Sequence, residues 1–224
     1  MSTLIKTLMA NDVEGWHSSA IVTHSDEGLI EMIGAWISAK KKLKNLIIRE
    51  EIDLAHIHVT HSMSWWRKRS LMRICSKNGI PAVIHIHSGK FDDFCRGVAG
   101  KSVKRELAVS GRATVVLEKR WLLKLKKWVP KNTQVVRNTS NFVFSGKEEI
   151  SFDSPVRFLI MSRDDYVKGH DFAIKVVEIL RKRGIESELS ITGSNGMDDH
   201  KHGGWIKFLG WLSEERKVEV LQES

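Results

Sequence analysis

Short apolar runs alternate with segments of helical periodicity along most of this chain. Runs typical of strands cover residues 18–23, 53–59, 82–87, 113–117, 133–137, 156–161, 188–192 and 205–209. Helical spacing of apolar residues covers residues 2–10, 29–47, 62–78, 103–109, 119–128, 171–183 and the stretch from Glu214, while residues 88–100 are predicted to form a glycine-containing loop. Parallel strands need long connections that helices usually provide. The alternation therefore predicts an α/β fold with Rossmann-like, doubly wound parallel sheets.

The periodicity is lost over residues 138–154, where serine, asparagine, glycine and glutamate accumulate. Such a change marks a boundary between domains. We predict an N-terminal Rossmann-like domain at 1–140, a linker at 141–154 and a C-terminal Rossmann-like domain at 155–224. The first domain opens on a helix, so its first strand is expected before Ser2. The second has about 70 residues against the ~100–150 of an ordinary domain, and we expect it to be incomplete.

The composition indicates a globular chain with anionic partners. Hydrophobic residues make up 42% and charged residues 28% of the 224 residues, and the net charge is +9. This charge favours nucleotide-sugars, nucleic acid or anionic lipid headgroups as partners. Two cysteines, Cys75 and Cys95, favour a reducing cytoplasm over a disulfide framework. Since no apolar run reaches about 18 residues, we expect no membrane-spanning helix.

The loop between the strand at 156–161 and the helix at 171–183 carries Arg163, Lys168 and Gly169. Free backbone N–H groups and the positive end of a helix attract anions, and two cationic side chains add to that attraction. The loop therefore predicts an anion site, with phosphate as the ligand. Its spacing matches neither a Walker loop nor the GxGxxG fingerprint. The alternative is a solvated loop with ordinary surface charge.

Two strands carry paired histidines, His56 with His58 and His85 with His87. Because strand side chains alternate, each pair points to one face of the sheet. Three interpretations compete. Two histidines of one strand can chelate zinc; His56 and His85 can be neutral structural groups hydrogen-bonded inside the sheet; His58 and His87 can bind substrate at the strand ends, where parallel sheets place their ligands.

The basic stretch at 119–131 has two interpretations. Trp121, Leu122, Leu125 and Trp128 share one helical face, and lysines occupy the rest. Such a helix can lie on an anionic membrane. The alternative, which we favour, is a core helix with a lysine-rich outer face, because a helix that packs on a sheet needs an apolar stripe.

Several of these segments, taken in order, resemble family 4 glycosyltransferases, which are retaining enzymes of the GT-B fold. The segments that carry the resemblance are DLAHIH at 53–58, PAVIHIHSG at 81–89, VVRN at 135–138, the arginine and Lys-Gly of the 162–169 loop, ITGSNG at 191–196 and FLGWLS at 208–213. The sequence departs from the family pattern at Ser88, which separates His87 from Gly89, and at Glu118, where serine is usual. A glutamate pair that holds the donor sugar in the family is expected beyond Ser224, so we expect these residues alone to bind nucleotide-sugars weakly.

The resemblance implies a role for particular residues. His87 would hydrogen-bond the donor sugar as the catalytic histidine, and Arg163, Lys168 and Gly169 would bind the donor diphosphate. The remaining candidates are Gly193, Gly210 and Trp211 near the donor nucleotide and His58 and Arg67 on the acceptor side. It also implies a metal-independent reaction without a cofactor.

The leading hypothesis is a retaining glycosyltransferase, or a piece of one, that transfers sugar from a nucleotide-sugar to a surface-glycan or lipid-linked acceptor. The location expected is cytoplasmic, with peripheral contact at the inner face of the membrane. The alternative is a non-catalytic α/β protein that binds anions or nucleic acid. A single tyrosine and dispersed basic residues argue against nucleic acid. The leading hypothesis requires His87 to face Arg163 and Lys168 across a cleft between domains.

Overall fold

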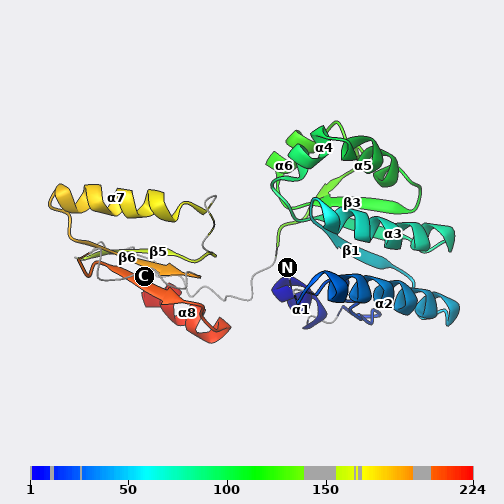
Figure 1. The fold of residues 1–224 in the computed structure, drawn as a ribbon, viewed down its shortest axis with the longest axis horizontal. Helices are drawn as coiled ribbons and strands as arrows, with labels where there is room; N and C mark the ends of the chain where they lie inside the picture. The colour runs from blue at the N-terminus through cyan, green and yellow to red at the C-terminus, as the bar shows by residue number, and fades with distance from the viewer. Residues whose placement is uncertain are drawn as a thin grey trace. The chain divides into compact units, whose positions relative to one another are not determined.

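The structure is a computed structural model that describes residues 2–10, 13–25, 27–138, 155–163, 165, 168–193 and 203–223. The chain divides into two compact units, residues 1–141 and 142–224, each with its own parallel sheet. Figure 1 shows the helices and strands of each unit. The predicted linker at 141–154 lies outside the described residues.

The first unit contains a four-stranded parallel sheet in the order β1-β2-β3-β4. The strands are β1 (Ala55–Val59), β2 (Ala82–Ile86), β3 (Arg112–Val116) and β4 (Gln134–Val135). The helices are α1 (Ser2–Ala10), α2 (Leu29–Ile48), α3 (Met63–Lys77), α4 (Phe91–Arg96), α5 (Ala99–Leu107) and α6 (Lys119–Leu125). Helices connect each strand to the next, as the parallel arrangement requires.

The second unit contains a three-stranded parallel sheet in the order β5-β6-β7. Its elements are β5 (Val156–Ile160), α7 (His170–Lys182), β6 (Ser187–Thr192), β7 (Ile206–Gly210) and α8 (Glu214–Glu223). The helices α7 and α8 lie on opposite faces of this sheet (Figure 1). Ile174 and Val177 of α7 pack with Leu189 and Ile191 of β6 in a small apolar core.

The parallel α/β architecture predicted from the alternation is confirmed. In both sheets the strand order follows the chain order, whereas a doubly wound sheet reverses its order at one point. The described strands contain no such reversal, and the doubly wound, GT-B form of the fold therefore stays a prediction.

Two predicted segments are wrong. Residues 18–23 form no strand, because β-branched residues make a strand only where a neighbouring backbone pairs with them; Ile21 instead packs against the core. Residues 88–100 contain α4 and the start of α5 rather than a loop. Gly100, one of the glycines of the predicted loop, lies within α5 for a packing reason, since a Cβ on it would come within 2.1 Å of the Cys95 carbonyl oxygen.

The core of the first unit lies between its sheet and α3. Arg112, which is in register with Ala82, donates to the Met72 carbonyl of α3, so this side of the sheet faces α3. Ile84 and Ile86, on the same side of β2, are fully buried. The core also receives the apolar face of α6: Leu125 is buried, and Trp121 packs against the cluster. The core-helix interpretation of the basic stretch is therefore confirmed for α6.

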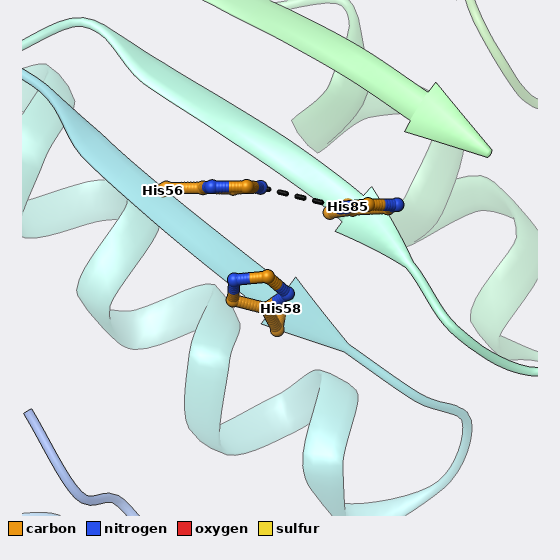
Figure 2. Close-up of side chains that lie close together, drawn as sticks. All are labelled: His56, His58 and His85. Atoms are coloured by element: carbon orange, nitrogen blue, oxygen red, sulfur yellow. Dashed lines mark hydrogen bonds between the residues drawn. The ribbon is translucent and has the colours of Figure 1, made fainter. Parts of the chain in front are cut away.

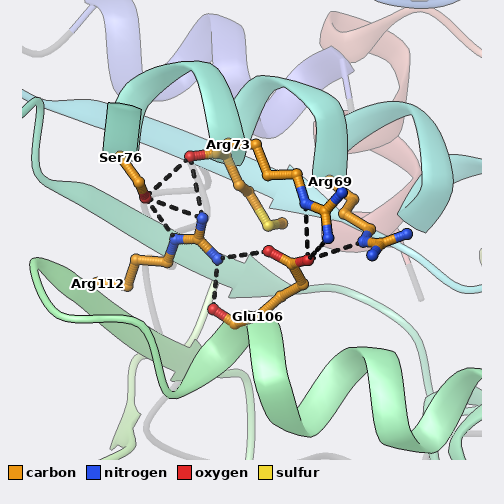
Figure 3. A network of polar contacts seen from close by, with 6 residues as sticks. Arg69, Arg73, Ser76, Glu106 and Arg112 are labelled. Atoms are coloured by element: carbon orange, nitrogen blue, oxygen red, sulfur yellow. Dashed lines mark hydrogen bonds and ion pairs between the residues drawn. The ribbon is translucent and has the colours of Figure 1, made fainter. Parts of the chain in front are cut away.

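A buried carboxylate ties α5 to α3 and β3 (Figure 3). Glu106 accepts hydrogen bonds from Arg69 and Arg73 of α3, both at 2.8 Å, and from Arg112 of β3 at 3.1 Å. Arg112 also donates to Ser76 of α3 at 2.9 Å. Burial disfavours the charged carboxylate, but the hydrogen bonds from the three arginines outweigh it and lower the pKa of Glu106 to about 2.

Among the described helices, none is long and apolar enough to cross a membrane.

Candidate functional site

Four histidines lie together on the face of the first sheet opposite α3. His58 of β1 is in register with His85 of β2, and strand alternation places His56 and His87 on the same face. His56 Nε2 lies 3.2 Å from His85 Nδ1, and His58 Nδ1 lies 2.8 Å from His87 Nε2. Figure 2 shows three of these rings, His56 and His58 from β1 and His85 from β2. The prediction that each pair shares one face is confirmed.

These imidazoles are held in the neutral form. Burial, followed by the neighbouring histidines, lowers the pKa of His58 to about 3, and the same causes lower the pKa of His87 to about 3. Burial and then His56 lower the pKa of His85 to about 4, and burial lowers the pKa of His56. A neutral imidazole offers one donor and one acceptor nitrogen. The four rings therefore form an uncharged polar face that can bind hydroxyl groups or a metal ion.

The expectation of structural histidines is confirmed only in part. His56 and His85 are hydrogen-bonded to each other, and His85 is 4% exposed. His56, however, is exposed to solvent near the start of β1. His58, predicted at the strand end as a substrate-binding group, is 8% exposed.

His87 follows β2, and its backbone N–H donates to the Val59 carbonyl at 2.8 Å. The next residue, Ser88, turns the chain into α4. Its hydroxyl is 2.7 Å from His61 Nδ1 and accepts a hydrogen bond from the Lys90 N–H at 3.2 Å. The serine that interrupts the family pattern therefore has a structural role, since its hydroxyl satisfies a backbone donor at the start of the helix.

Two basic side chains of α3 lie near the end of β1. Lys68 donates to the His58 carbonyl at 3.0 Å, and burial, followed by the charge of Arg67, lowers the pKa of Lys68 to about 8. Arg67, a candidate acceptor-side residue, is 7% exposed and contacts the sulfur of Met32 on α2 at 3.1 Å. Arg67 thus packs between α2 and α3, and its acceptor role stays a prediction.

The anion loop of the second unit connects β5 to α7. Arg163 and Lys168 are both exposed. Gly169 caps α7 in the left-handed conformation, with φ 77°, and its carbonyl accepts from the Ala173 N–H at 3.0 Å. Behind the loop, the Ser162 hydroxyl lies 2.8 Å from Nε2 of the buried His170. The cationic side chains therefore stand on a loop whose two ends are held by the sheet and the helix.

The predicted nucleotide-side glycines lie at the carboxyl ends of β6 and β7. Gly193 has φ +72°, and its N–H donates to the Gly210 carbonyl at 2.7 Å. A Cβ on Gly193 would come within 2.4 Å of the Ser162 carbonyl oxygen and 2.9 Å of Arg163 Cα. Gly193 thus brings the end of β6 against the β5 loop. Trp211, directly after Gly210, is 64% exposed.

The candidate residues fall into two groups, one in each unit. His58, His87 and Arg67 belong to the first unit, and the β5 loop and the glycines belong to the second. A cleft in which His87 faces Arg163 stays a prediction.

A hollow of about 810 Å³ opens at the carboxyl ends of β3 and β4 of the first unit. Lys119, Arg120 and Arg137 line it together with Glu118, which pairs with Arg120 at 3.3 Å. The basic residues outnumber the single carboxylate, so the hollow favours an anionic ligand. These residues, together with Lys68 and His61, were not predicted to form a site, because their proximity is found only once the strand ends are known.

No protein-family model matches the sequence, and no curated protein matches it significantly. The resemblance to glycosyltransferases therefore rests on the motifs alone.

Proposed function

We propose that this chain is a retaining, nucleotide-sugar-dependent glycosyltransferase of GT-B type, or a piece of one. In this proposal the second unit binds the donor diphosphate, and the neutral His87 of the first unit hydrogen-bonds the donor sugar. The acceptor is a surface glycan or a lipid-linked molecule.

The observation that carries the proposal is the contact between Gly193 and the β5 loop. Because Gly193 carries no Cβ, its backbone approaches the Ser162 carbonyl and Arg163 closely. The contact fixes the loop that presents Arg163 and Lys168 beside the start of α7. A fixed cationic loop at a helix N-terminus suits a diphosphate, which gains negative charge as the sugar leaves.

The histidine face supports the acceptor-side half of the proposal. The lowered pKa of His87 keeps its ring neutral at pH 7, so the ring can donate to or accept from a sugar hydroxyl. Charge stabilisation then falls to Arg163 and Lys168, and the loss of either contact should slow transfer about 10²–10³-fold.

A second candidate function, a non-catalytic anion-binding protein, is favoured by the basic hollow at the ends of β3 and β4. In this case the anion would contact Arg120 and Arg137 in the first unit, and the β5 loop would play no part. The two candidates therefore differ in which unit binds a nucleotide.

An NMR titration distinguishes them. UDP and GDP are each added to the ¹⁵N-labelled chain, with uridine and guanosine as matched ligands that lack the diphosphate. We expect the diphosphates alone to shift the Gly169 and Gly193 amide signals. The variants Arg163→Ala and Lys168→Ala should weaken these shifts, and Lys175→Ala, which removes an exposed lysine from the middle of α7, should not.

Shifts confined to Arg120 and Arg137 would favour the second candidate and contradict the first. Equal shifts by nucleoside and nucleoside diphosphate would show that the loop does not recognise phosphate. A positive binding result is followed by a transfer assay, in which UDP- and GDP-sugars are incubated with extracted lipid acceptors and Arg163→Ala serves as the inactive control.

A further inference from the structure

We propose that His56, His58 and His85 form a binding site for a divalent transition-metal ion of the zinc type on the face of the first sheet opposite α3. The site is independent of the proposed donor-binding loop, because all of its ligands lie on β1 and β2.

The three histidines are close enough to share one ion. Each offers a ring nitrogen, and these nitrogens all lie within 4.8 Å of one another. Two nitrogens bound to one tetrahedral zinc at about 2.0–2.1 Å stand roughly 3.3–3.4 Å apart, and His56 Nε2 and His85 Nδ1 are separated by 3.2 Å. His58 completes the set from the same strand as His56 (Figure 2). A tetrahedral site would require the His58 nitrogen to move closer to the other two by rotation about its broad terminal torsion.

The strands hold this arrangement before any ion arrives. His58 and His85 are in register on adjacent parallel strands, and both side chains are more than nine-tenths buried. His56 is exposed, and it opens the site to solvent. The site therefore has two buried ligands and one accessible ligand, so an ion can enter without opening the sheet.

The protonation of the rings is compatible with ligation. A metal-bound imidazole nitrogen carries no proton, so the proton shared by His56 Nε2 and His85 Nδ1 must leave that contact. Each ring keeps its single proton on the other nitrogen, Nδ1 in His56 and Nε2 in His85. Nε2 of His85 is buried and makes no hydrogen bond with the described residues.

The ligand set selects the class of ion. Imidazole nitrogens suit zinc, cobalt, nickel and copper, whereas magnesium and calcium prefer oxygen ligands. Three protein ligands leave a fourth position open, as in exchangeable and catalytic zinc sites. His87, whose ring contacts His58 at 2.8 Å, lies beside the three-histidine cluster.

The test uses the full chain purified without a polyhistidine tag and stripped with a chelator. Cobalt(II) is titrated while visible absorption is recorded, and zinc is then added in competition. We expect one cobalt per chain, displaced by one zinc. The variant His56→Ala should bind at least about tenfold more weakly. His56 is exposed, so this variant should fold normally, and His17→Ala, at an exposed histidine outside the cluster, should bind as the wild type does.

Two further measurements separate this site from other sources of binding. Thiolate ligands give cobalt an intense near-ultraviolet band, and we expect no such band because Cys75 and Cys95 are buried. In ¹⁵N spectra of the histidine rings, zinc should shift His56, His58 and His85 and leave His61 unchanged. Zinc should also raise the melting temperature of the wild type more than that of His56→Ala.

The proposal is overturned if the wild type retains no cobalt or zinc, if His56→Ala binds as tightly as His17→Ala, or if the ring signals that respond to zinc belong to histidines outside the three. In these cases the cluster is a hydrogen-bonded structural array only.

Discussion

Gly193 and Ser162 meet backbone to backbone at the carboxyl ends of β6 and β5. A Cβ on Gly193 would lie 2.4 Å from the Ser162 carbonyl oxygen, closer than real Cβ contacts. The glycine also has φ +72°, a conformation that L-residues adopt at a cost. Two independent constraints therefore require glycine at this position, and both act on the loop that carries Arg163.

We predict that Gly193→Ala destabilises the second unit by about 2–4 kcal/mol, of which roughly 1–2 kcal/mol comes from the left-handed backbone and the rest from the clash. Urea unfolding, followed through the NMR amide signals of β6, measures the free energy of unfolding of this unit. The matched control is Gly184→Ala. Gly184 has φ +82° with no atom within 4 Å of its Cβ position, so only the backbone cost applies there. Equal losses in the two variants would refute the contact.

Glu106 joins three segments of the first unit, and its removal should be costly. In Glu106→Gln the guanidinium of Arg112, whose side chain is 2% exposed, loses its only charged partner among the described residues. Breaking a buried ion pair in this way costs about 3–5 kcal/mol. Glu118→Gln, which removes an exposed carboxylate paired with Arg120, should change the free energy of unfolding by less than about 0.5 kcal/mol. Thermal unfolding of both variants at pH 7 tests this, and a similar small loss in each would contradict the role of Glu106.

The lowered pKa of Glu106 also predicts how the free energy of unfolding depends on pH. Its pKa is about 2 in the folded chain against an ordinary value of 4.5, so the unfolded chain binds the proton first as the pH falls. The stabilising contribution is complete above about pH 4.5 and is lost as the pH falls from there towards 2. It amounts to on the order of 3 kcal/mol. Urea midpoints measured for the wild type and Glu106→Gln should converge over this range, and a constant difference would contradict the prediction.

The elements could be predicted from the sequence wherever one local pattern decided them. The strands β1 and β2 were found because short apolar runs end at glycine, proline or polar residues. The strand predicted at residues 18–23 does not form, because a strand also needs a neighbouring backbone to pair with, and the local sequence does not reveal one. The glycine at position 100 is explained by tertiary packing rather than by a loop. Cys95 and Trp128 approach Gly100 too closely for a side chain.

The candidate sites were predictable to a similar degree. The alternation of strand side chains alone placed each histidine pair on one face of the sheet. The register that makes His58 and His85 neighbours on adjacent strands depends on strand pairing. The sequence left the zinc interpretation open, because spacing along the chain does not give the distance between the histidines of the two strands. The contact of Arg67 with Met32 likewise depends on tertiary packing, which the sequence position of Arg67 does not reveal.

The two cysteines give a last prediction, on chemical reactivity. Both are buried; burial, followed by the charge of Asp92, raises the pKa of Cys95 to about 12, and burial raises that of Cys75. At pH 8 only about one Cys95 side chain in ten thousand is then a thiolate, the reactive form.

We expect neither cysteine to react with a disulfide-exchange reagent until the first unit opens, and we expect urea to accelerate labelling in parallel with unfolding. The exposed variant Ser110→Cys supplies a thiol that should react at once under the same conditions. Labelling of the wild-type chain at the rate of that added thiol would show that the core around α3 and α4 is open in solution.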